Sequence, residues 1–158
     1  MTKPPSSKEL LLDEEEIRNL MNEYCFAIDS GDFVTFAKLF QNAEWIAEGK
    51  KPSNESANNI IIYEDGTPKT KHTITNISIN VDEARKKATA HSYVTVYQGT
   101  SDFPLQAIFS GDYFDEFKNI NAIWHFSKRE IRNSITGDMT AHLKIPSLTI
   151  PSAKDKMK

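Results

Sequence analysis

The sequence predicts an α+β fold in which a strongly curved sheet wraps around two or three N-terminal helices. Apolar residues recur at helical spacing through the first third of the chain. After Gly66 they alternate with polar residues over four long segments, as in strands with one buried face. Helices followed by a meander of antiparallel strands are typical of α+β proteins. A sheet curved around helices would enclose an apolar pocket suited to a ligand.

Two helices are expected at the start of this domain. The acidic cluster at 13–16 favours a helix N-terminus, and an apolar stripe follows it, made of Ile17, Leu20, Met21, Tyr24 and Ile28. Gly31 predicts the end of the first helix because glycine suits the left-handed C-cap position. Asp32 can cap a second, short helix that ends near Phe40.

The rest of the chain is expected to form strands, with one more helix before them. Residues 43–47 predict a short strand, and residues 56–63 predict a third helix, although three β-branched isoleucines there lower its helix propensity. Turn-forming residues separate the four long strands, which are expected at 69–81, 87–99, 104–118 and 122–135. We expect a single domain over 13–145, a flexible lead at 1–12 and a loosely held polar tail at 146–158.

The composition limits the function classes. The chain has 158 residues, 39% hydrophobic and 26% charged, which is ordinary for a soluble single domain. A net charge of -3 gives no reason to expect nucleic acid or an anionic membrane as partner. The apolar runs are too short for a signal peptide or a membrane span, so we expect a cytoplasmic protein. Cys25 is the one cysteine, which excludes an intramolecular disulfide, and we expect it in the core.

Three residues carry most of the chemical information. Asp29 falls in the last turn of the first helix, where the macrodipole disfavours an acid, so it needs a partner such as a histidine. His72 is predicted to share a strand face with Ile74 and Asn76, a mixture suited to a pocket wall. Tyr24 lies on the apolar stripe. Together a phenol, a carboxylate and an imidazole can move protons without a metal or cofactor.

Each of these residues also has a purely structural interpretation. Tyr24 suits a core tyrosine whose hydroxyl finds one partner. Asp29 suits an acid that faces solvent or forms a turn, and His72 suits a satisfied structural histidine. No ligand spacing among histidines and acids supports a metal site.

Several local motifs resemble the SnoaL-like branch of the nuclear transport factor-2-like superfamily. The resemblance rests on residues 27–32 with 36–40, 71–76, 90–93, 124–126 with Arg129, and 137–142. It implies a cone-shaped, cystatin-like α+β roll with a mixed or antiparallel sheet. Because this fold hosts many activities, the resemblance alone leaves the function open.

At the level of residues, the chain most resembles two dehydratases of that superfamily, scytalone dehydratase and bile-acid 7α-dehydratase, and the strand histidine of the first matches His72. Bile-acid 7α-dehydratase has a tyrosine, an aspartate five positions later and a strand histidine, which match Tyr24, Asp29 and His72. The resemblance implies a cofactor-free dehydratase or isomerase that acts on a small apolar hydroxy-ketone or polycyclic substrate. His72 would be the general base, Asp29 would orient its ring, and Tyr24 would donate a hydrogen bond. The motif 137–142 has no assigned role.

Six further residues are candidates for substrate binding: Asn76, His91, Asp112, Trp124, Phe126 and Arg129. Asp112 is the candidate for the strand carboxylate of polyketide cyclases and ketosteroid isomerases, and with Arg129 for part of an epoxide hydrolase set. His91 would turn to the opposite face if its register shifted by one residue. Alternation predicts Trp124 and Phe126 on one face of their strand and His125 and Arg129 on the other.

Two alternatives to an enzyme stay open on the same fold: a non-catalytic ligand-binding protein, and a small subunit of a ring-hydroxylating dioxygenase-type complex. An apolar sheet face left open by the helices suggests self-association. We therefore expect a homo-oligomer, either a dimer or a trimer.

Overall fold

The computed structural model describes residues 3–47 and 59–145 of the chain. Within these residues two helices precede five strands, and their bounds are α1 (Ser7–Ser30), α2 (Phe33–Phe40), β1 (Glu44–Ala47), β2 (Thr70–Val81), β3 (Lys87–Gln98), β4 (Gln106–Ile120) and β5 (Ile123–Thr136). All five strands form one sheet in the order β1-β5-β4-β3-β2. The pairing of β1 with β5 is parallel and the other pairings are antiparallel.

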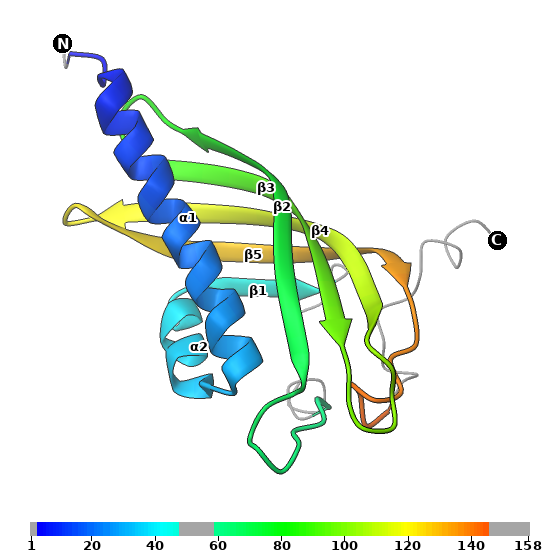
Figure 1. Ribbon diagram of the computed structural model, residues 1–158. Helices are drawn as coiled ribbons and strands as arrows, with labels where there is room; N and C mark the ends of the chain where they lie inside the picture. The colour runs from blue at the N-terminus through cyan, green and yellow to red at the C-terminus, as the bar shows by residue number, and fades with distance from the viewer. Residues whose placement is uncertain (1–2, 48–58, 146–158) are drawn as a thin grey trace.

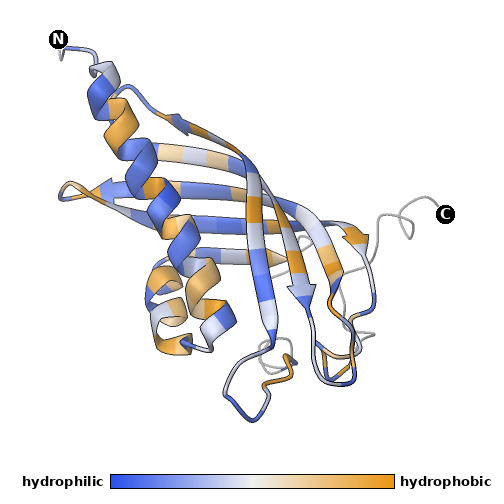
Figure 2. Ribbon diagram, in the orientation of Figure 1, coloured by the Kyte–Doolittle hydropathy of each residue, from blue (hydrophilic) through white to orange (hydrophobic). Residues whose placement is uncertain are grey.

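The sheet is long and curved, and both helices lie on its inner face (Figure 1). The helix α1 crosses this face obliquely, and α2 folds back beside its C-terminal end. In Figure 2 the hydrophobic residues of α1 form a stripe along the helix, and those of the strands alternate with polar ones. This architecture confirms the predicted α+β fold with a curved sheet around N-terminal helices.

The first helix begins earlier than the acidic cluster predicted. Ser6 is its N-cap and forms a capping box with Glu9, in which the Glu9 backbone N–H donates to the Ser6 hydroxyl at 3.3 Å. In return the Ser6 backbone N–H donates to the Glu9 carboxylate at 2.8 Å. Residues 7–12, expected to belong to a flexible lead, are therefore helical because the box satisfies two otherwise free backbone donors.

The junction between the helices forms as predicted. Gly31 is the C-cap of α1 in the left-handed conformation, at φ 76°. Asp32 caps α2 by accepting a hydrogen bond from the Thr35 backbone N–H at 3.0 Å. A Cβ atom on Gly31 would overlap the carbonyl oxygen of Gly66, so the end of α1 lies directly against the turn that leads into β2.

The prediction of a third helix at 56–63 is wrong for residues 59–63, the part that the structure describes. Residues 59–63 are extended: Ile60 forms an isolated β-bridge with Leu143, and the Ile61 backbone N–H donates to the His142 carbonyl at 2.9 Å. The β-branched isoleucines favour this extended path over a helix. Residues 56–58 and the tail at 146–158 lie outside the described residues.

The short strand and the four long strands are confirmed, with ends shifted by a residue or two. The turn between β4 and β5 is centred on Asn121 and Ala122, which both have positive φ, 53° and 64°. Two successive residues with positive φ are typical of the type I′ hairpin turn, whose twist matches that of the strands.

Bulges in the sheet change which residues face inward. In β2 the register shifts between Thr75 and Ser78, and Asn76 within the shift has φ 53°. After this bulge Ile77 and Ile79 pack against the core, while Asn76 is exposed. The predicted sharing of a face by His72 and Asn76 is therefore wrong, because the bulge inverts the alternation.

A second shift alters β5 in the same way. Glu116 pairs with Lys128 but Phe117 pairs with Phe126, so Ser127 has no partner position on β4. Phe126 and Arg129 consequently both face inward, at 3% and 0% exposure. The predicted placement of these two residues on opposite faces is wrong for this reason.

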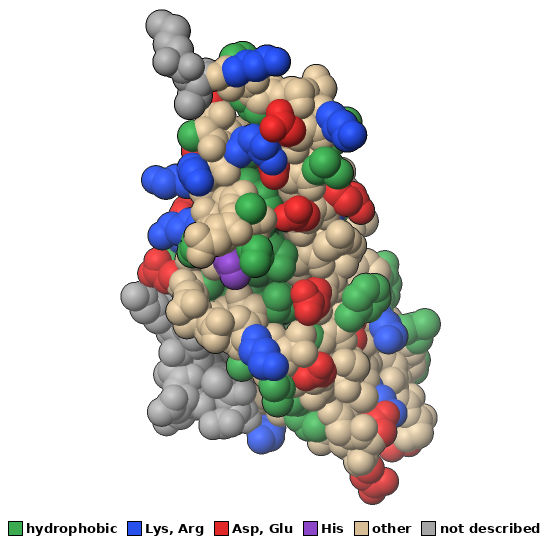
Figure 3. All heavy atoms as spheres, turned by 90° about the vertical axis from the view of Figure 1, so that its left-hand side faces the viewer, with side chains coloured by type: hydrophobic (Ala, Val, Ile, Leu, Met, Phe, Trp, Pro, Cys, Tyr) green, Lys and Arg blue, Asp and Glu red, His purple; other side chains and the backbone are tan. Residues whose placement is uncertain are grey.

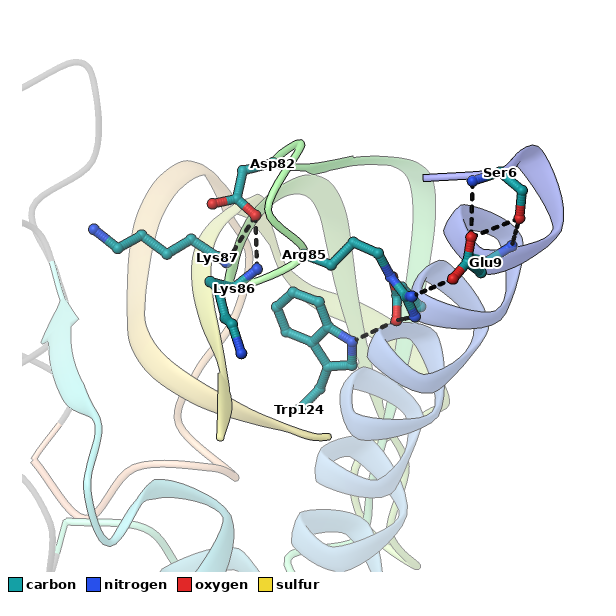
Figure 4. A network of polar contacts seen from close by, with 8 residues as sticks. Ser6, Glu9, Asp82, Arg85, Lys86, Lys87 and Trp124 are labelled. Atoms are coloured by element: carbon teal, nitrogen blue, oxygen red, sulfur yellow. Dashed lines mark hydrogen bonds and ion pairs between the residues drawn. The ribbon is translucent and has the colours of Figure 1, made fainter. Parts of the chain in front are cut away.

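The N-terminal half of α1 is bound to the sheet by a polar network (Figure 4). Buried Asp13 accepts a hydrogen bond from the Trp124 indole N–H at 3.0 Å and one from the Arg85 Nε–H at 2.6 Å. The Arg85 side chain also hydrogen-bonds the Asp13 carboxylate through Nη2, and this pairing holds the pKa of Asp13 below its usual value. Trp124 is thus a buried core residue at this end of the molecule.

The surface carries charges of both signs. On the face seen in Figure 3, acidic and basic side chains lie interspersed among hydrophobic ones. Neither helix in the described part of the chain combines the length and apolar character needed to span a bilayer.

Candidate active site

Asp29 and His72 form the centre of the candidate site. Asp29 lies one residue before the end of α1, His72 is the third residue of β2, and the close packing of Gly31 on Gly66 brings these two segments together (Figure 1). The His72 Nδ1 atom lies 2.6 Å from Asp29 Oδ1, and the two side chains are 9% and 7% exposed. The partner that Asp29 was predicted to need is therefore His72.

Among the described residues, three donors bind the Asp29 carboxylate. The backbone N–H of His72 donates to Oδ2 at 2.7 Å, and the Thr70 hydroxyl donates to Oδ1 at 2.8 Å. The third donor is the His72 ring. Burial raises the pKa of Asp29, but these hydrogen bonds and the imidazole outweigh it, so the net direction is downward. Asp29 is accordingly ionised at neutral pH.

An ionised Asp29 decides the tautomer of His72. A carboxylate can only accept, so the short contact requires the proton on His72 Nδ1. In the neutral ring this leaves the lone pair on Nε2, which is the atom able to take a proton from a ligand. The same arrangement stabilises the imidazolium that forms once the proton has moved.

Tyr24 stands beside this pair. Its ring meets the His72 ring edge to face, with centroids 5.9 Å apart and planes at 81°. Burial raises the pKa of Tyr24 to about 12, against the opposing charge of Arg129. The neighbouring Tyr113 side chain also lowers the pKa of Tyr24, by less than burial raises it. Tyr24 is therefore a neutral phenol at neutral pH and can donate a hydrogen bond.

Arg129 and Asp115 form a buried ion pair next to Tyr24. The Arg129 guanidinium lies 4.4 Å from the centre of the Tyr24 ring and 4.0 Å from that of Tyr113. It donates two hydrogen bonds to Asp115, at 2.8 and 2.7 Å. Burial lowers the pKa of Arg129, but the Asp115 carboxylate raises it by more, so the guanidinium stays charged. Its Nη1 atom is buried and has no hydrogen-bond partner among the described residues.

Aromatic rings enclose the other side of Tyr24. Three of them come from the second helix and the first strand: Phe36, Phe40 and Trp45 lie with centroids 5.9, 5.7 and 5.8 Å from that of Tyr24. Phe126 lies in the adjoining cluster, 4.7 Å from Phe40. The polar groups of the site therefore sit among large apolar surfaces, which strengthen electrostatic interactions.

The remaining predicted residues lie elsewhere. His91 and Asp112 hydrogen-bond to each other at 2.7 Å on the outer face of the sheet, away from the helices. This separates Asp112 from Arg129, so the two do not form an epoxide hydrolase set, and Asp112 is not an inward strand carboxylate. Asn76 is exposed at its bulge, and Trp124 is engaged with Asp13.

A groove of about 360 Å³ lies on this outer face. Its lining includes His91, Phe114, Glu116, Lys128 and Arg132. The groove is separated from Tyr24, Asp29 and His72 by the sheet itself. Among the described residues, no group of three or more His, Cys, Asp or Glu side chains is arranged to hold a metal ion.

Sequence reasoning did not identify Thr70, Tyr113 or Asp115 as neighbours of the site, and it assigned no role to the motif 137–142, which contains His142. Asp115 and Arg129 are cross-strand partners, but the bulge at Ser127 hides this pairing from any pattern based on alternation. Thr70 lies two residues before His72 on the same strand face, a spacing that was available in the sequence. His142 lies close enough for the charges of His72 and Asp29 to alter its pKa.

Comparison with known proteins agrees with the fold. A family profile described as a SnoaL-like domain matches residues 9–130. No curated protein matches the chain in sequence. A provisionally assigned scytalone dehydratase from Novosphingobium aromaticivorans superimposes with a TM-score of 0.66 at 21% identity, covering 84% of this chain and 91% of that one.

Two further solved structures are similar to the same degree. Hexachlorocyclohexane dehydrochlorinase LinA-type3 from Novosphingobium barchaimii has a TM-score of 0.65 at 19% identity, covering 92% of this chain and 100% of that one. A cystatin-like protein of unknown function from Nostoc punctiforme has a TM-score of 0.65 at 17% identity, covering 87% and 99%. At sequence identities this low, the structural superpositions establish a common fold alone.

Proposed function

The chain belongs to the family of SnoaL-like domains, as its motifs indicated, and we propose that it is a cofactor-free acid/base enzyme that catalyses an elimination or an isomerisation. The substrate is a small, largely apolar hydroxy-ketone or polycyclic molecule. The observation that carries the proposal is the buried contact of 2.6 Å between His72 and Asp29 beside the phenol of Tyr24.

The first step is removal of a proton from carbon. His72 Nε2 accepts a proton from a C–H bond next to a carbonyl, and the bonding electrons move onto the carbonyl oxygen as an enolate. The Asp29 carboxylate holds the ring in the productive tautomer and stabilises the imidazolium. General base catalysis of this kind contributes typically 10²–10⁴-fold to a rate.

The second step separates a dehydratase from an isomerase. In a dehydratase the enolate electrons return to form a carbon–carbon double bond, and the neighbouring hydroxyl departs as water after taking a proton. In an isomerase the imidazolium returns its proton to a different carbon. Tyr24, a neutral donor, either stabilises the enolate oxygen or protonates the departing hydroxyl.

Arg129 supports both steps through its charge. Its guanidinium lies against the Tyr24 ring in a buried setting, where a positive charge favours developing negative charge nearby. Asp115 occupies two of its donor atoms, and Nη1 is left for a ligand oxygen. Arg129 therefore keeps the ligand-binding role proposed from the sequence, with Nη1 as the atom that performs it.

The named relatives are consistent with this chemistry. A dehydratase removes water and a dehydrochlorinase removes hydrogen chloride, and both reactions take a proton from one carbon while a group leaves the next. The common requirement is a positioned base in an apolar site. Because Asp112 lies on the outer face, the cyclase and epoxide hydrolase alternatives lose their candidate carboxylate.

The test begins with a ligand search. Hydroxy-ketones, steroids, terpenoids and chlorinated cyclohexanes are screened by thermal shift, since binding to the native state raises its melting temperature. Compounds that bind are then followed for loss of water or chloride, and for exchange of carbon-bound hydrogen in D₂O. We expect His72→Ala to lower turnover at least about 100-fold and Tyr24→Phe at least about tenfold.

His91→Ala is the matched control, because it removes a histidine with the same type of partner on the opposite face. It is expected to leave turnover within about twofold of the wild type. Circular dichroism establishes that each variant is folded. Equal turnover in the wild type and in both site variants would refute the proposal, and binding without turnover or exchange would favour a ligand-binding protein instead.

A further inference from the structure

The segment 137–145, which follows β5, has a backbone held in place from several directions. The Ala141 carbonyl accepts hydrogen bonds from the Gln98 amide at 2.9 Å and from the Tyr63 hydroxyl at 2.6 Å. After Ala141 the backbone bonds to the chain near residue 60: the Ile61 N–H donates to the His142 carbonyl at 2.9 Å, and the Lys144 N–H donates to the Asn59 carbonyl at 2.8 Å. His142 is thus fixed at its position.

The imidazole of His142 carries a buried polar atom. Its Nδ1 atom is buried and no described residue offers it a hydrogen-bond partner. A buried, unpaired polar nitrogen costs stability, so its persistence suggests a partner supplied from outside the protein. Met139, three residues earlier, packs on the cluster that contains Tyr24, which places this segment beside the site.

The electrostatic surroundings identify its neighbours. Burial and the neighbouring imidazole of His72 lower the pKa of His142 to about 4, and the negative charge of Asp29 opposes them. Among the described residues, His72 and Asp29 are therefore the titratable groups near enough to influence this ring. At neutral pH it is uncharged, with one nitrogen that donates and one that accepts.

We propose that His142 is a specificity-determining residue of the same site, which hydrogen-bonds a hydroxyl or carbonyl oxygen of the substrate through Nδ1. This inference rests on the proposed function and narrows it. It selects oxygenated substrates, and thus loss of water or a keto–enol shift, over loss of chloride from a chlorinated hydrocarbon.

The physical reason is the cost of leaving a polar group unpaired. A hydroxyl or carbonyl satisfies the buried nitrogen, whereas a chlorine or hydrogen in the same place leaves it without a partner. Sites built to hydrogen-bond a substrate oxygen discriminate strongly against analogues that lack it. An oxygen held near both His142 and the His72–Asp29 pair also lies close to the proposed base.

A series of bicyclic probes on one carbon skeleton tests the proposal without requiring turnover. The probes are 2-decalone, 2-decalol, 2-chlorodecalin and decalin, and their dissociation constants are measured by calorimetry. We expect the wild type to bind the two oxygenated probes at least tenfold more tightly than the chlorinated one.

Two substitutions then separate a specific role from a structural one. His142→Phe keeps a planar ring but removes the polar atoms, and should reduce the preference to within about threefold. His142→Gln keeps a donor and an acceptor, and should restore most of it. His125→Phe, on the exposed start of β5, is the matched control and should leave the preference unchanged.

The inference is overturned if the wild type shows no preference, if no probe of the series binds, or if His142→Phe retains the full preference. Its failure is distinguishable from failure of the proposed function. A lost preference in His142→Phe together with unchanged turnover in His72→Ala would retain the His142 site and reject the acid/base enzyme. The reverse pattern would retain the enzyme and reject His142.

Discussion

The two faces of the sheet each carry a histidine–aspartate pair of almost equal length, and the environments differ. His72 and Asp29 lie 2.6 Å apart on the inner face, and His91 and Asp112 lie 2.7 Å apart on the outer face. The inner side chains are 9% and 7% exposed, whereas the outer ones are 46% and 22% exposed. The same two functional groups at almost the same distance therefore interact with different strength, because only the inner pair is largely removed from water.

The other partners of each pair extend the contrast. The outer Asp112 also accepts a hydrogen bond from the Ser134 hydroxyl at 2.9 Å, and the His91 ring stacks on Phe114 at 4.5 Å. The carboxylate stands between imidazole and hydroxyl, so the histidine cannot activate the serine. The inner Asp29 instead binds backbone and ring of the same histidine, which leaves Nε2 directed away from it.

Ion pairs on adjacent residues repeat the comparison. Asp115 and Arg129 are 0% exposed, whereas the next pair, Glu116 and Lys128, has side chains 54% and 29% exposed. Buried pairs cost much when broken, and exposed pairs cost little. Substitutions at neighbouring positions should thus have very different effects on stability.

The largest effect is expected from Asp115→Asn, which leaves the buried guanidinium of Arg129 without its counter-charge. It should lower the free energy of unfolding by about 3–5 kcal/mol, measured by urea denaturation. Glu116→Gln is the matched control, and should change that free energy by less than about 0.5 kcal/mol. Comparable losses in both variants would show that burial does not distinguish the two faces.

A second test of the contrast uses Asp29→Asn and pH. The variant loses hydrogen bonds to a charged group, and should lower the free energy of unfolding by about 2–3 kcal/mol at pH 7. Because the folded-state pKa of Asp29 is depressed, its contribution is complete above the unfolded value near 3.8 and is lost as pH falls through the folded value. The difference between the wild type and the variant should therefore shrink below about pH 4.

Urea denaturation at a series of pH values from 7 to 3 measures this difference. Asp112→Asn, the equivalent change on the outer face, should cost no more than about 1 kcal/mol at pH 7. A constant difference between wild type and Asp29→Asn over the whole pH range would contradict the assignment of a stabilising, ionised Asp29.

The smallest effect on stability is expected at the bulge in β2, which decides which residues of that strand face inward. Asn76 has φ 53°, a conformation that asparagine and glycine adopt far more readily than β-branched residues. Asn76→Val should lower the free energy of unfolding by about 1–2 kcal/mol, and Asn76→Gly should change it by less than about 0.5 kcal/mol. Ser78→Val is the control, on the same strand and equally exposed. Equal effects at both positions would mean that the bulge is not under conformational constraint.

These bulges also mark the limit of what the sequence could predict. The periodicity of apolar residues and the turn-forming residues predicted the helices and strands, because each of these signals is local. Examples are Gly31 as a C-cap, Asp32 as an N-cap and the alternation along each strand. Asp29 with His72 was predictable because a helix-end acid requires a partner. The inward position of Arg129 and the outward position of Asn76 were not, since one inserted residue reverses every face beyond it.

The start of α1 shows a different limit. Two start signals compete within ten residues, and the capping box at Ser6 outweighs the acidic cluster that begins at Asp13. Asp13 is instead a buried acceptor for Trp124 and Arg85, contacts that join residues more than seventy positions apart and leave no local trace. Long-range polar contacts of this kind become visible only in the folded chain.

The attachment of α1 at both ends has a consequence for how a molecule would reach the site. Asp13 fastens one end to Arg85 and Trp124, and Asp29 fastens the other to Thr70 and His72, so the helix cannot swing outward without breaking both sets of bonds. The shorter α2 has no fully buried residue and rests on the aromatic side chains of Phe36 and Phe40. We therefore expect a ligand to enter and leave the site beside α2, while α1 stays in place.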